Sequence, residues 1–391
     1  MPNIPIQKLT IKNCGCIKSA EVNLTRLHAL IGPNDSGKST ILRALRTATQ
    51  FATGEFARIK NVVVQGSGPQ GWQGNQVASA DLNRVTSVEI LPFVPLVGEK
   101  SGDAFIGITL ENALEYQVGN GDELCELAFD HSERPPLPLL SRRQPRSLDG
   151  KSPLWTSAYA IPDPARRLAR LKEQIAPATL VRFDPDALRA AAPLLLDGEG
   201  VRFADERGAG LPAVYDAIRN NVEAFQSIVE RVRDLFPTVK NITVSVPAAG
   251  MKAVKVTLKD GKDIGAHEMS EGLLYFLGFA ALQYCGPSLL LVEEPENGLH
   301  PSRIRDVMNV LRKISESTQV VLATHSPLVI NEMKPNEVTV VTRDAAGTHC
   351  MPIGKTKGFE DRIKVYALGE LWLSYANGKD EAPLLNGGAR E

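Results

Sequence analysis

The chain has 391 residues, more than one hydrophobic core usually supports, so one large elaborated domain or two lobes is expected. Apolar residues make up 43% of it and charged residues 23%, which excludes a disordered chain, a collagen and a coiled-coil rod. The 44 basic and 45 acidic side chains leave a net charge of −1, so contact with DNA would need a local basic patch.

The apolar residues and the cysteines favour a cytoplasmic protein. No apolar run approaches the roughly 18 residues that cross a membrane, and the first residues lack the apolar stretch of a secretory signal. The chain has 5 cysteines, an odd number without zinc-site spacing, so we expect reduced thiols rather than a disulfide framework.

The N-terminal segment predicts a hairpin, a strand, a loop and a helix in that order. Residues 4–12 alternate apolar and polar side chains, and residues 20–31 end in the apolar run LHALI. This pattern is typical of a hairpin followed by a buried strand. Residues 39–51 carry apolar side chains at helical spacing, so the glycine-containing loop before them should open a helix.

Strand-forming residues and prolines dominate the next part of the chain. Residues 86–96 and 104–118 predict β-structure. Residues 132–164 contain seven prolines, which remove backbone donors, and predict a linker or an extended arm outside the core. Its run SRRQPR at 141–146 is either a phosphate contact or a solvated loop.

A helical region follows. Residues 164–175 start with a proline after an aspartate, which indicates a helix start. Residues 212–236 place apolar side chains at three- and four-residue steps and predict one long amphipathic helix. Residues 241–258 predict a hairpin around Ala-Ala-Gly.

The strongest chemical signal is the segment GPNDSGKST at residues 32–40, which fits the phosphate-loop pattern between a predicted strand and a predicted helix. Glycines let the backbone wrap around phosphates, and free N–H groups at the helix start face the anion. Lys38 would bridge the β- and γ-phosphates of ATP, and Ser39 would bind Mg²⁺. The other nucleotide-binding candidates in the loop are Gly32, Asn34, Asp35, Ser36, Gly37 and Thr40.

Two carboxylates follow a short apolar run, SLLLV, at residues 288–292. Such a run predicts a buried parallel strand, and its carboxyl end lies at the edge where open α/β sheets bind ligands. Beside a phosphate loop, Glu293 would support Mg²⁺ and Glu294 would orient the attacking water, since phosphoryl transfer depends mainly on positioning and charge. Taken alone, two acids in this place are a common surface turn.

Two further segments complete the candidate site. His325 follows the apolar run at 320–323 and could contact a γ-phosphate or the water, the alternative being a buried core histidine. A helix over 301–314 would place it in the same sheet as the acidic strand. Ser270 would cap a helix, and Gly272 would allow a ligand to approach the backbone closely. The segment is therefore either a second anion site or an ordinary capped helix.

The order GPNDSGKST, SEGL, LLVEEPENGLHP and ATHSP resembles ABC-type ATPases that process or guard DNA, namely the RecF/SMC-like and OLD-like bacterial branch, often labelled AAA-type. The likeness covers residues 4–50 and 265–345 well and the middle in outline. It implies nucleotide held between two heads, so that Ser270 and Gly272 contact the γ-phosphate bound by a partner copy. Residues 297–300 would match a dimer-contacting loop.

The chain departs from that pattern in four places. Glu293 stands where many relatives have Asp, and Ser-Glu-Gly at 270–272 is a degenerate signature. The glutamine-bearing loop has four indistinguishable candidates, Gln65, Gln70, Gln73 and Gln76. No Asp-x-Asp cluster of a nuclease follows residue 327, so we expect any nuclease to be a separate chain.

The fold class expected is therefore α/β, an ABC-type P-loop head with a mixed or parallel central sheet, an N-terminal antiparallel subdomain and a helical lobe. We assign residues 1–130 to an N-terminal lobe, 131–264 to a proline-rich arm with an insertion, and 265–391 to a C-terminal lobe. The expected function is an Mg²⁺-dependent ATPase that dimerises on ATP and acts on DNA or on a separate effector. The alternatives are a transporter subunit and a non-hydrolysing scaffold. The degenerate signature at 270–272 disfavours the transporter, and the intact Lys38 and Glu294 disfavour the scaffold.

Overall fold

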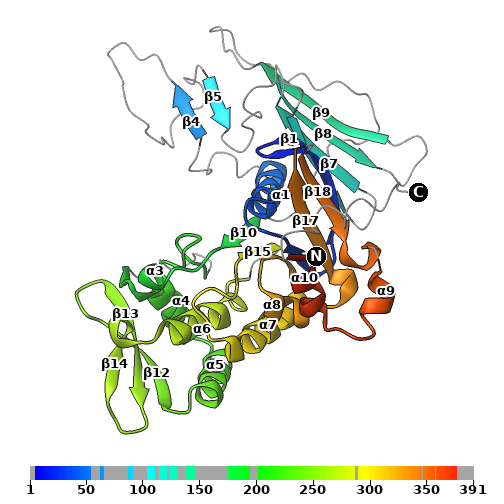
Figure 1. Ribbon diagram of the computed structural model, residues 1–391. Coiled ribbons are helices and arrows are strands. Elements are labelled where there is room, and N and C mark those ends of the chain that lie inside the picture. Colours follow the sequence, from blue (N-terminus) through cyan, green and yellow to red (C-terminus); the bar gives the residue numbers. More distant parts are fainter. Residues whose placement is uncertain are drawn as a thin grey trace, which may run out of the picture.

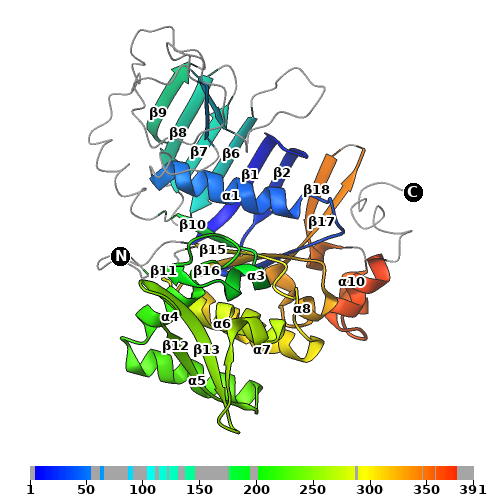
Figure 2. The ribbon, with the colours of Figure 1, turned by 90° about the vertical axis from the view of Figure 1, so that its left-hand side faces the viewer.

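The computed structural model describes residues 5–53, 62–65, 87–90, 104–110, 114–120, 123–130, 137–145, 175, 177–193, 201–286, 289–345, 347–356 and 358–376. These residues form two large sheets with a helix between them, and a helical lobe with a small sheet of its own (Figures 1 and 2). The expected α/β class with a mixed central sheet, an antiparallel N-terminal subdomain and a helical lobe is confirmed.

The central sheet has the strand order β10-β15-β16-β3-β17-β18. Its first five strands pair in parallel and β18 pairs antiparallel with β17. Every residue of β3, β15 and β16 is buried, as expected for short apolar strands covered on both faces. The bounds are β3 Leu27–Ile31, β10 Ala178–Val181, β15 Leu289–Glu293, β16 Gln319–Thr324, β17 Val338–Asp344 and β18 Gly347–Pro352.

The second large sheet is antiparallel, in the order β2-β1-β6-β7-β8-β9. Helix α1 (Lys38–Thr53) lies between the two sheets, as Figure 2 shows. Its buried residues Ile41 and Leu45 share one core with Leu9 of β1 and Leu291 of β15. The predicted hairpin, strand, loop and helix are thus confirmed. The bounds are β1 Ile6–Cys14, β2 Ile17–Asn23, β6 Ala104–Leu110, β7 Leu114–Asn120, β8 Glu123–Asp130 and β9 Leu137–Pro145.

The proline-rich segment differs from its prediction as a linker. Its residues 137–145 form β9, the edge strand of the antiparallel sheet, paired with β8. Prolines are tolerated at a sheet edge because no further strand needs their missing N–H donors. The predicted helix at 164–175 lies outside the described residues except for Ile175. Strands β4 (Val62–Gln65) and β5 (Ser87–Ile90) form a separate antiparallel pair.

The helical lobe covers the other face of the central sheet, and its core is continuous with residues of β3 and β15. The predicted hairpin is confirmed as β12 (Val239–Ser245) and β13 (Met251–Leu258). Two short strands, β11 (Ala192–Pro193) and β14 (Asp263–Gly265), both pair with β13. The helices are α3 Pro185–Arg189, α4 Leu211–Ile218, α5 Val222–Leu235, α6 Glu271–Leu282, α7 Pro301–Ser315, α8 Pro327–Asn331, α9 Phe359–Arg362 and α10 Leu368–Ala376.

The prediction of one long helix over 212–236 is wrong, because the chain breaks between α4 and α5. Asn221 has extended backbone angles, and its side chain accepts a hydrogen bond from the amide of Ala224. Asparagine stabilises a helix start in this way better than a helix interior. Val222, an apolar residue within that range, consequently faces solvent, with 76% of its surface exposed.

The middle of the chain contributes to the central sheet as well as to the helical lobe. Strand β10 pairs with β15, so part of the expected insertion is integral to the central sheet. The proposed domain boundaries remain a prediction. Within the described ranges no helix is both long and apolar enough to cross a membrane.

The buried His28 on β3 makes folding stability depend on pH. Thr25 Oγ1 donates to the carbonyl of Leu27, so it accepts from His28 Nδ1 at 3.2 Å, which leaves Nε2 to accept from Thr339 Oγ1 at 3.0 Å. This pairing suits a neutral imidazole. Burial lowers the pKa of His28 from 6.5 to about 4, and Glu337 opposes that shift.

Because the unfolded chain takes up this proton first, His28 should cost about 3 kcal/mol of stability as pH falls from 7 to 4. Urea unfolding of His28→Gln at pH 4 to 7 should therefore show a shallower pH dependence than the parent. His267→Gln, at an exposed histidine, is the control. Equal slopes for His28→Gln and the parent would contradict the assignment.

Candidate functional site

Residues 32–37 connect β3 to α1 and residues 38–40 begin that helix, so the phosphate loop has the predicted strand and helix on its two sides. Gly32 leaves no room for a side chain, since a Cβ would overlap the carbonyl oxygen of Val341. Asp35 and Gly37 have positive φ angles of 63° and 108°. Such backbone reversals make a concave row of N–H groups that binds anions. Asn34, Asp35 and Ser39 are exposed here.

Lys38 lies inside this loop. Its Nζ donates to the carbonyl oxygens of Gly32 and Pro33, each at 2.7 Å, and only 9% of the residue is exposed. Burial lowers the pKa of Lys38, while nearby carboxylates, Glu294 first among them, act to raise it. The loop thus holds a cation at the place where a triphosphate would need one.

The two carboxylates stand at the carboxyl end of β15. Glu293 is 5% exposed, whereas Glu294 follows it with a φ of 49°, uncommon for a residue with a side chain. The amide of Glu294 donates to the carbonyl oxygen of Ala323 at 2.8 Å, and Asn297 Nδ2 donates to Glu294 Oε2 at 2.7 Å. These contacts hold the Glu294 carboxylate at the edge of the sheet.

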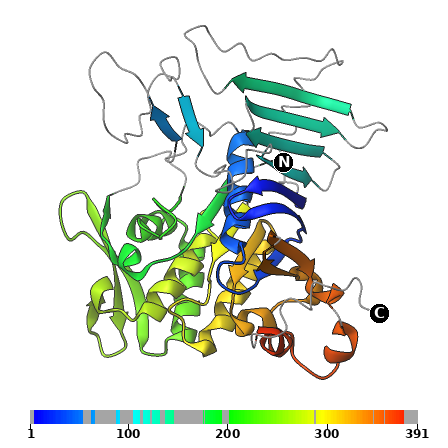
Figure 3. The ribbon, with the colours of Figure 1, turned by 45° about the horizontal axis from the view of Figure 1, so that its top comes forward.

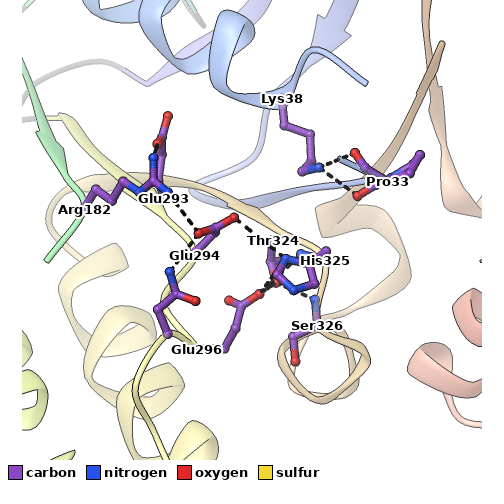
Figure 4. A network of polar contacts seen from close by, with 11 residues as sticks. Pro33, Lys38, Arg182, Glu293, Glu294, Glu296, Thr324, His325 and Ser326 are labelled. Carbon is purple, nitrogen blue, oxygen red and sulfur yellow. Dashed lines mark hydrogen bonds and ion pairs between the residues drawn. The ribbon is translucent and has the colours of Figure 1, made fainter. Parts of the chain in front are cut away.

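His325 follows β16 on the neighbouring strand and is not a core histidine, because 51% of its side chain is exposed. Its Nδ1 lies 3.9 Å from Glu294 Oε1 and 3.6 Å from Glu296 Oε1 (Figure 4). Glu296 Oε1 accepts from Thr324 Oγ1 at 2.6 Å and from the amide of His325 at 3.3 Å. The structure therefore joins the acidic strand to the histidine through Glu296.

Sequence reasoning missed Glu296 and Arg182. Glu296 was visible as the third acid of the run EEPE. Arg182 directly follows β10, and its guanidinium lies 3.7 Å from Glu293 Oε2 and 3.5 Å from Glu294 Oε2. The only signal for it was a charged residue after a short apolar run. Of the glutamine-loop candidates, Gln70, Gln73 and Gln76 lie outside the described residues, and only the backbone of Gln65 is described.

The second anion site and the loop at 297–300 lie together. Ser270 caps α6 by accepting a hydrogen bond from the amide of Leu273 at 3.4 Å, and it is exposed. A Cβ on Gly272 would stand 4.0 Å from the carbonyl oxygen of Gly298. Gly298, with a φ of 66°, admits no side chain because the ring of Tyr275 on α6 fills that space. One contiguous surface therefore carries both segments.

The polar atoms of the site fit a bound Mg²⁺–triphosphate. Ser36 Oγ, Glu293 Oε1 and Glu296 Oε2 are buried without a hydrogen-bond partner among the described residues. Buried polar atoms are normally paired, so these positions are suited to an incoming ligand. The described part of the chain has no group of three His, Cys, Asp or Glu residues arranged to hold a metal ion by itself. Mg²⁺ usually needs one or two protein ligands beside phosphate oxygens.

Solved structures with this fold include ATPase heads of SMC proteins. An SMC head bound to the C-terminal winged-helix domain of ScpA is 14% identical, with a TM-score of 0.51 over 88% of this chain and 97% of that one. The SMC head domain from Thermotoga maritima is 14% identical, and the match covers 89% of this chain and 99% of that one with a TM-score of 0.42. A Pyrococcus furiosus SMC head bound to the C-terminal domain of ScpA is 13% identical. The match covers 93% of this chain and 100% of that one, with a TM-score of 0.47.

Residues 27–331 match the family described as "AAA domain, putative AbiEii toxin, Type IV TA system". That span includes the phosphate loop, both carboxylates, His325 and the start of α6. The chain belongs to this AAA family, and its fold is that of an ABC-type ATPase head of the RecF/SMC kind.

Proposed function

We propose that this protein binds ATP with Mg²⁺ and hydrolyses it to ADP and phosphate. The observation that carries the proposal is the convergence of β3, β15 and β16 at one sheet edge, which brings Lys38 of the phosphate loop to the network of Glu294 and His325 (Figure 4). In open α/β sheets this edge is where ligands bind.

Each residue has a role that its surroundings support. Lys38 and the loop amides hold the phosphates, and Ser39 with the buried Glu293 holds Mg²⁺, which would neutralise charge on the phosphate oxygens. Glu294, held by Asn297 and 28% exposed, orients the attacking water. His325 is exposed at the same edge and contacts the γ-phosphate.

We also propose that two copies sandwich the nucleotide. Ser270 and Gly272 stand at the exposed first turn of α6, where amide groups and the helix dipole attract an anion. In a homodimer they would face the γ-phosphate bound by the partner, with residues 297–300 beside them. This arrangement is supported by the nearness of Gly272 to Gly298, since a Cβ added to Gly272 would stand 4.0 Å from the Gly298 carbonyl oxygen, and by the resemblance to ATPase heads that dimerise.

The biological role we propose is a cytoplasmic switch in bacterial DNA repair or phage defence. The ATP-bound dimer would act on DNA or activate a separate effector protein, such as a nuclease. The balanced net charge gives direct DNA binding no support of its own. The family description, which names a toxin of a type IV system, is compatible with a defence role.

Lys38→Ala should weaken ATP binding roughly ten- to a hundred-fold, because it removes a charge-assisted contact worth about 1.5–3 kcal/mol. Calorimetric titration with ATP and Mg²⁺ measures the change, and thermal unfolding verifies that the variant is folded. Lys12→Ala, at an exposed lysine on β1, is the matched control. Unchanged affinity in Lys38→Ala would place the nucleotide elsewhere.

Substituting the two carboxylates one at a time should distinguish ATP binding from ATP hydrolysis. Glu294→Gln keeps an oxygen for Asn297 but loses the carboxylate, so turnover should fall about 10²–10⁴-fold while ATP binding survives. Glu293→Gln should instead weaken Mg²⁺-dependent ATP binding. Affinity and single-turnover rates of both variants decide the assignment, with Glu316→Gln, at the exposed residue that follows α7, as control. The opposite pattern would exchange the two roles.

Assembly should depend on nucleotide. With Mg²⁺ and a non-hydrolysable ATP analogue, the parent should sediment as a dimer, since ligand that bridges two heads stabilises their complex. Ser270→Arg places a bulky side chain at the proposed interface and should remain monomeric. Ser270→Thr keeps the helix cap and should dimerise. Parent profiles that are the same with and without analogue would rule out the sandwich.

A further inference from the structure

Arg182 lies beside both carboxylates of the proposed site but belongs to neither the phosphate loop nor the acidic strand. It directly follows β10, which pairs in parallel with β15, so its backbone is level with the end of the acidic strand. Figure 4 shows its side chain reaching toward Glu293 and Glu294. Nη1 lies 3.7 Å from Glu293 Oε2 and Nη2 lies 3.5 Å from Glu294 Oε2, so one guanidinium spans the pair.

The backbone of Arg182 is fixed, although 56% of its side chain is exposed. Its amide donates to the carbonyl oxygen of Glu206 at 2.7 Å. The side chain of Glu206 in turn accepts from Arg46 Nη1 at 2.9 Å, and Arg46 belongs to α1, the helix of the phosphate loop. Arg182 is thus anchored to the same framework that carries Lys38.

Two neighbouring carboxylates repel each other, and a cation between them offsets that repulsion and keeps the two groups adjacent. Within the described ranges, no other Lys or Arg lies within ion-pair distance of Glu293 or Glu294. Lys38 is held by the loop carbonyls on the far side of Glu294 (Figure 4). A planar guanidinium can contact two carboxylates at once, which a lysine ammonium does less well.

We propose that Arg182 is a positioning residue for ATP hydrolysis. It bridges to the buried Glu293 and so holds the neighbouring Glu294 carboxylate facing the attacking water. This inference rests on the proposed ATPase function and adds to it a residue supplied by β10. The effect belongs to the chemical step, because Arg182 contacts the carboxylates rather than the phosphate loop.

The test is steady-state ATP hydrolysis by the full chain with Arg182→Ala, Arg182→Gln, Arg182→Lys and Arg207→Ala. Small displacements of reacting groups cost up to about 10²-fold, whereas a half-exposed ion pair is worth little by itself. We therefore expect kcat of Arg182→Ala and Arg182→Gln to fall about tenfold, with KM for ATP within about threefold of the parent. Arg182→Lys should recover part of the loss.

Arg207→Ala is the matched control. Arg207 is an exposed arginine in the same corner of the fold, but it pairs with Asp184 at 3.0 Å instead of the two glutamates. It should hydrolyse ATP at the parental rate. Equal kcat values for Arg182→Gln and Arg207→Ala, or a loss confined to KM, would overturn the proposal.

A double-mutant cycle separates positioning from general structural damage. If Arg182 acts through Glu294, adding Arg182→Gln to Glu294→Gln should lower the single-turnover rate no further. If the rate loss of the double variant equals the product of the losses of the two single variants, the inference is overturned while the ATPase function stays intact. A parent protein that hydrolyses no ATP would instead refute the proposed function, and the inference with it.

Discussion

The parallel pairing of β3, β16 and β15 is the constraint on which the site depends. Register places Glu293 opposite Ala323, Ala323 opposite Leu30, and Thr324 opposite Ile31. All three strands consequently end at one level. Alternate residues of β15 pack into different cores on the two faces of the sheet, so a shift by one residue would exchange the two sets of side chains and is disfavoured. The side chains of the proposed site are thus aligned by the apolar cores on the two faces of the sheet. Figure 3 shows the teal strands of the antiparallel sheet above and the green and yellow helices of the helical lobe below.

At that level the backbone adopts costly conformations. Asp35 and Glu294 have positive φ angles of 63° and 49°, each worth on the order of 1–3 kcal/mol of strain. Glu293, next to one of them, is buried with an unpaired carboxylate oxygen. Such conformations persist only when the surrounding contacts hold them in place, and here they occur where the strands end and the loops begin. Strain and an unpaired polar atom therefore coincide with the residues that we propose to contact the nucleotide, the metal and the attacking water.

Much of this arrangement could be predicted because each motif sits directly after a short apolar strand. The phosphate loop, Glu294 and His325 each follow such a run, and parallel strands bring their carboxyl ends together. Arg182 obeys the same rule but could not be found, since ATLV is an unremarkable segment and its pairing with β15 spans more than a hundred residues. The break at Asn221 was missed for a local reason: a cap competes with helix continuation, and periodicity does not detect it.

The loop after β15 connects the proposed chemistry to the proposed dimer surface within a few residues. Asn297 donates to the carboxylate of Glu294, and the next residue, Gly298, is packed against Tyr275 on α6. Tyr275 is buried, and close-packed contacts of this kind transmit displacement instead of absorbing it. A movement of Glu294 on binding or losing a γ-phosphate would therefore move the surface that carries Ser270 and Gly272. Under the proposed function, the state of the nucleotide and the surface offered to a second copy would therefore change together.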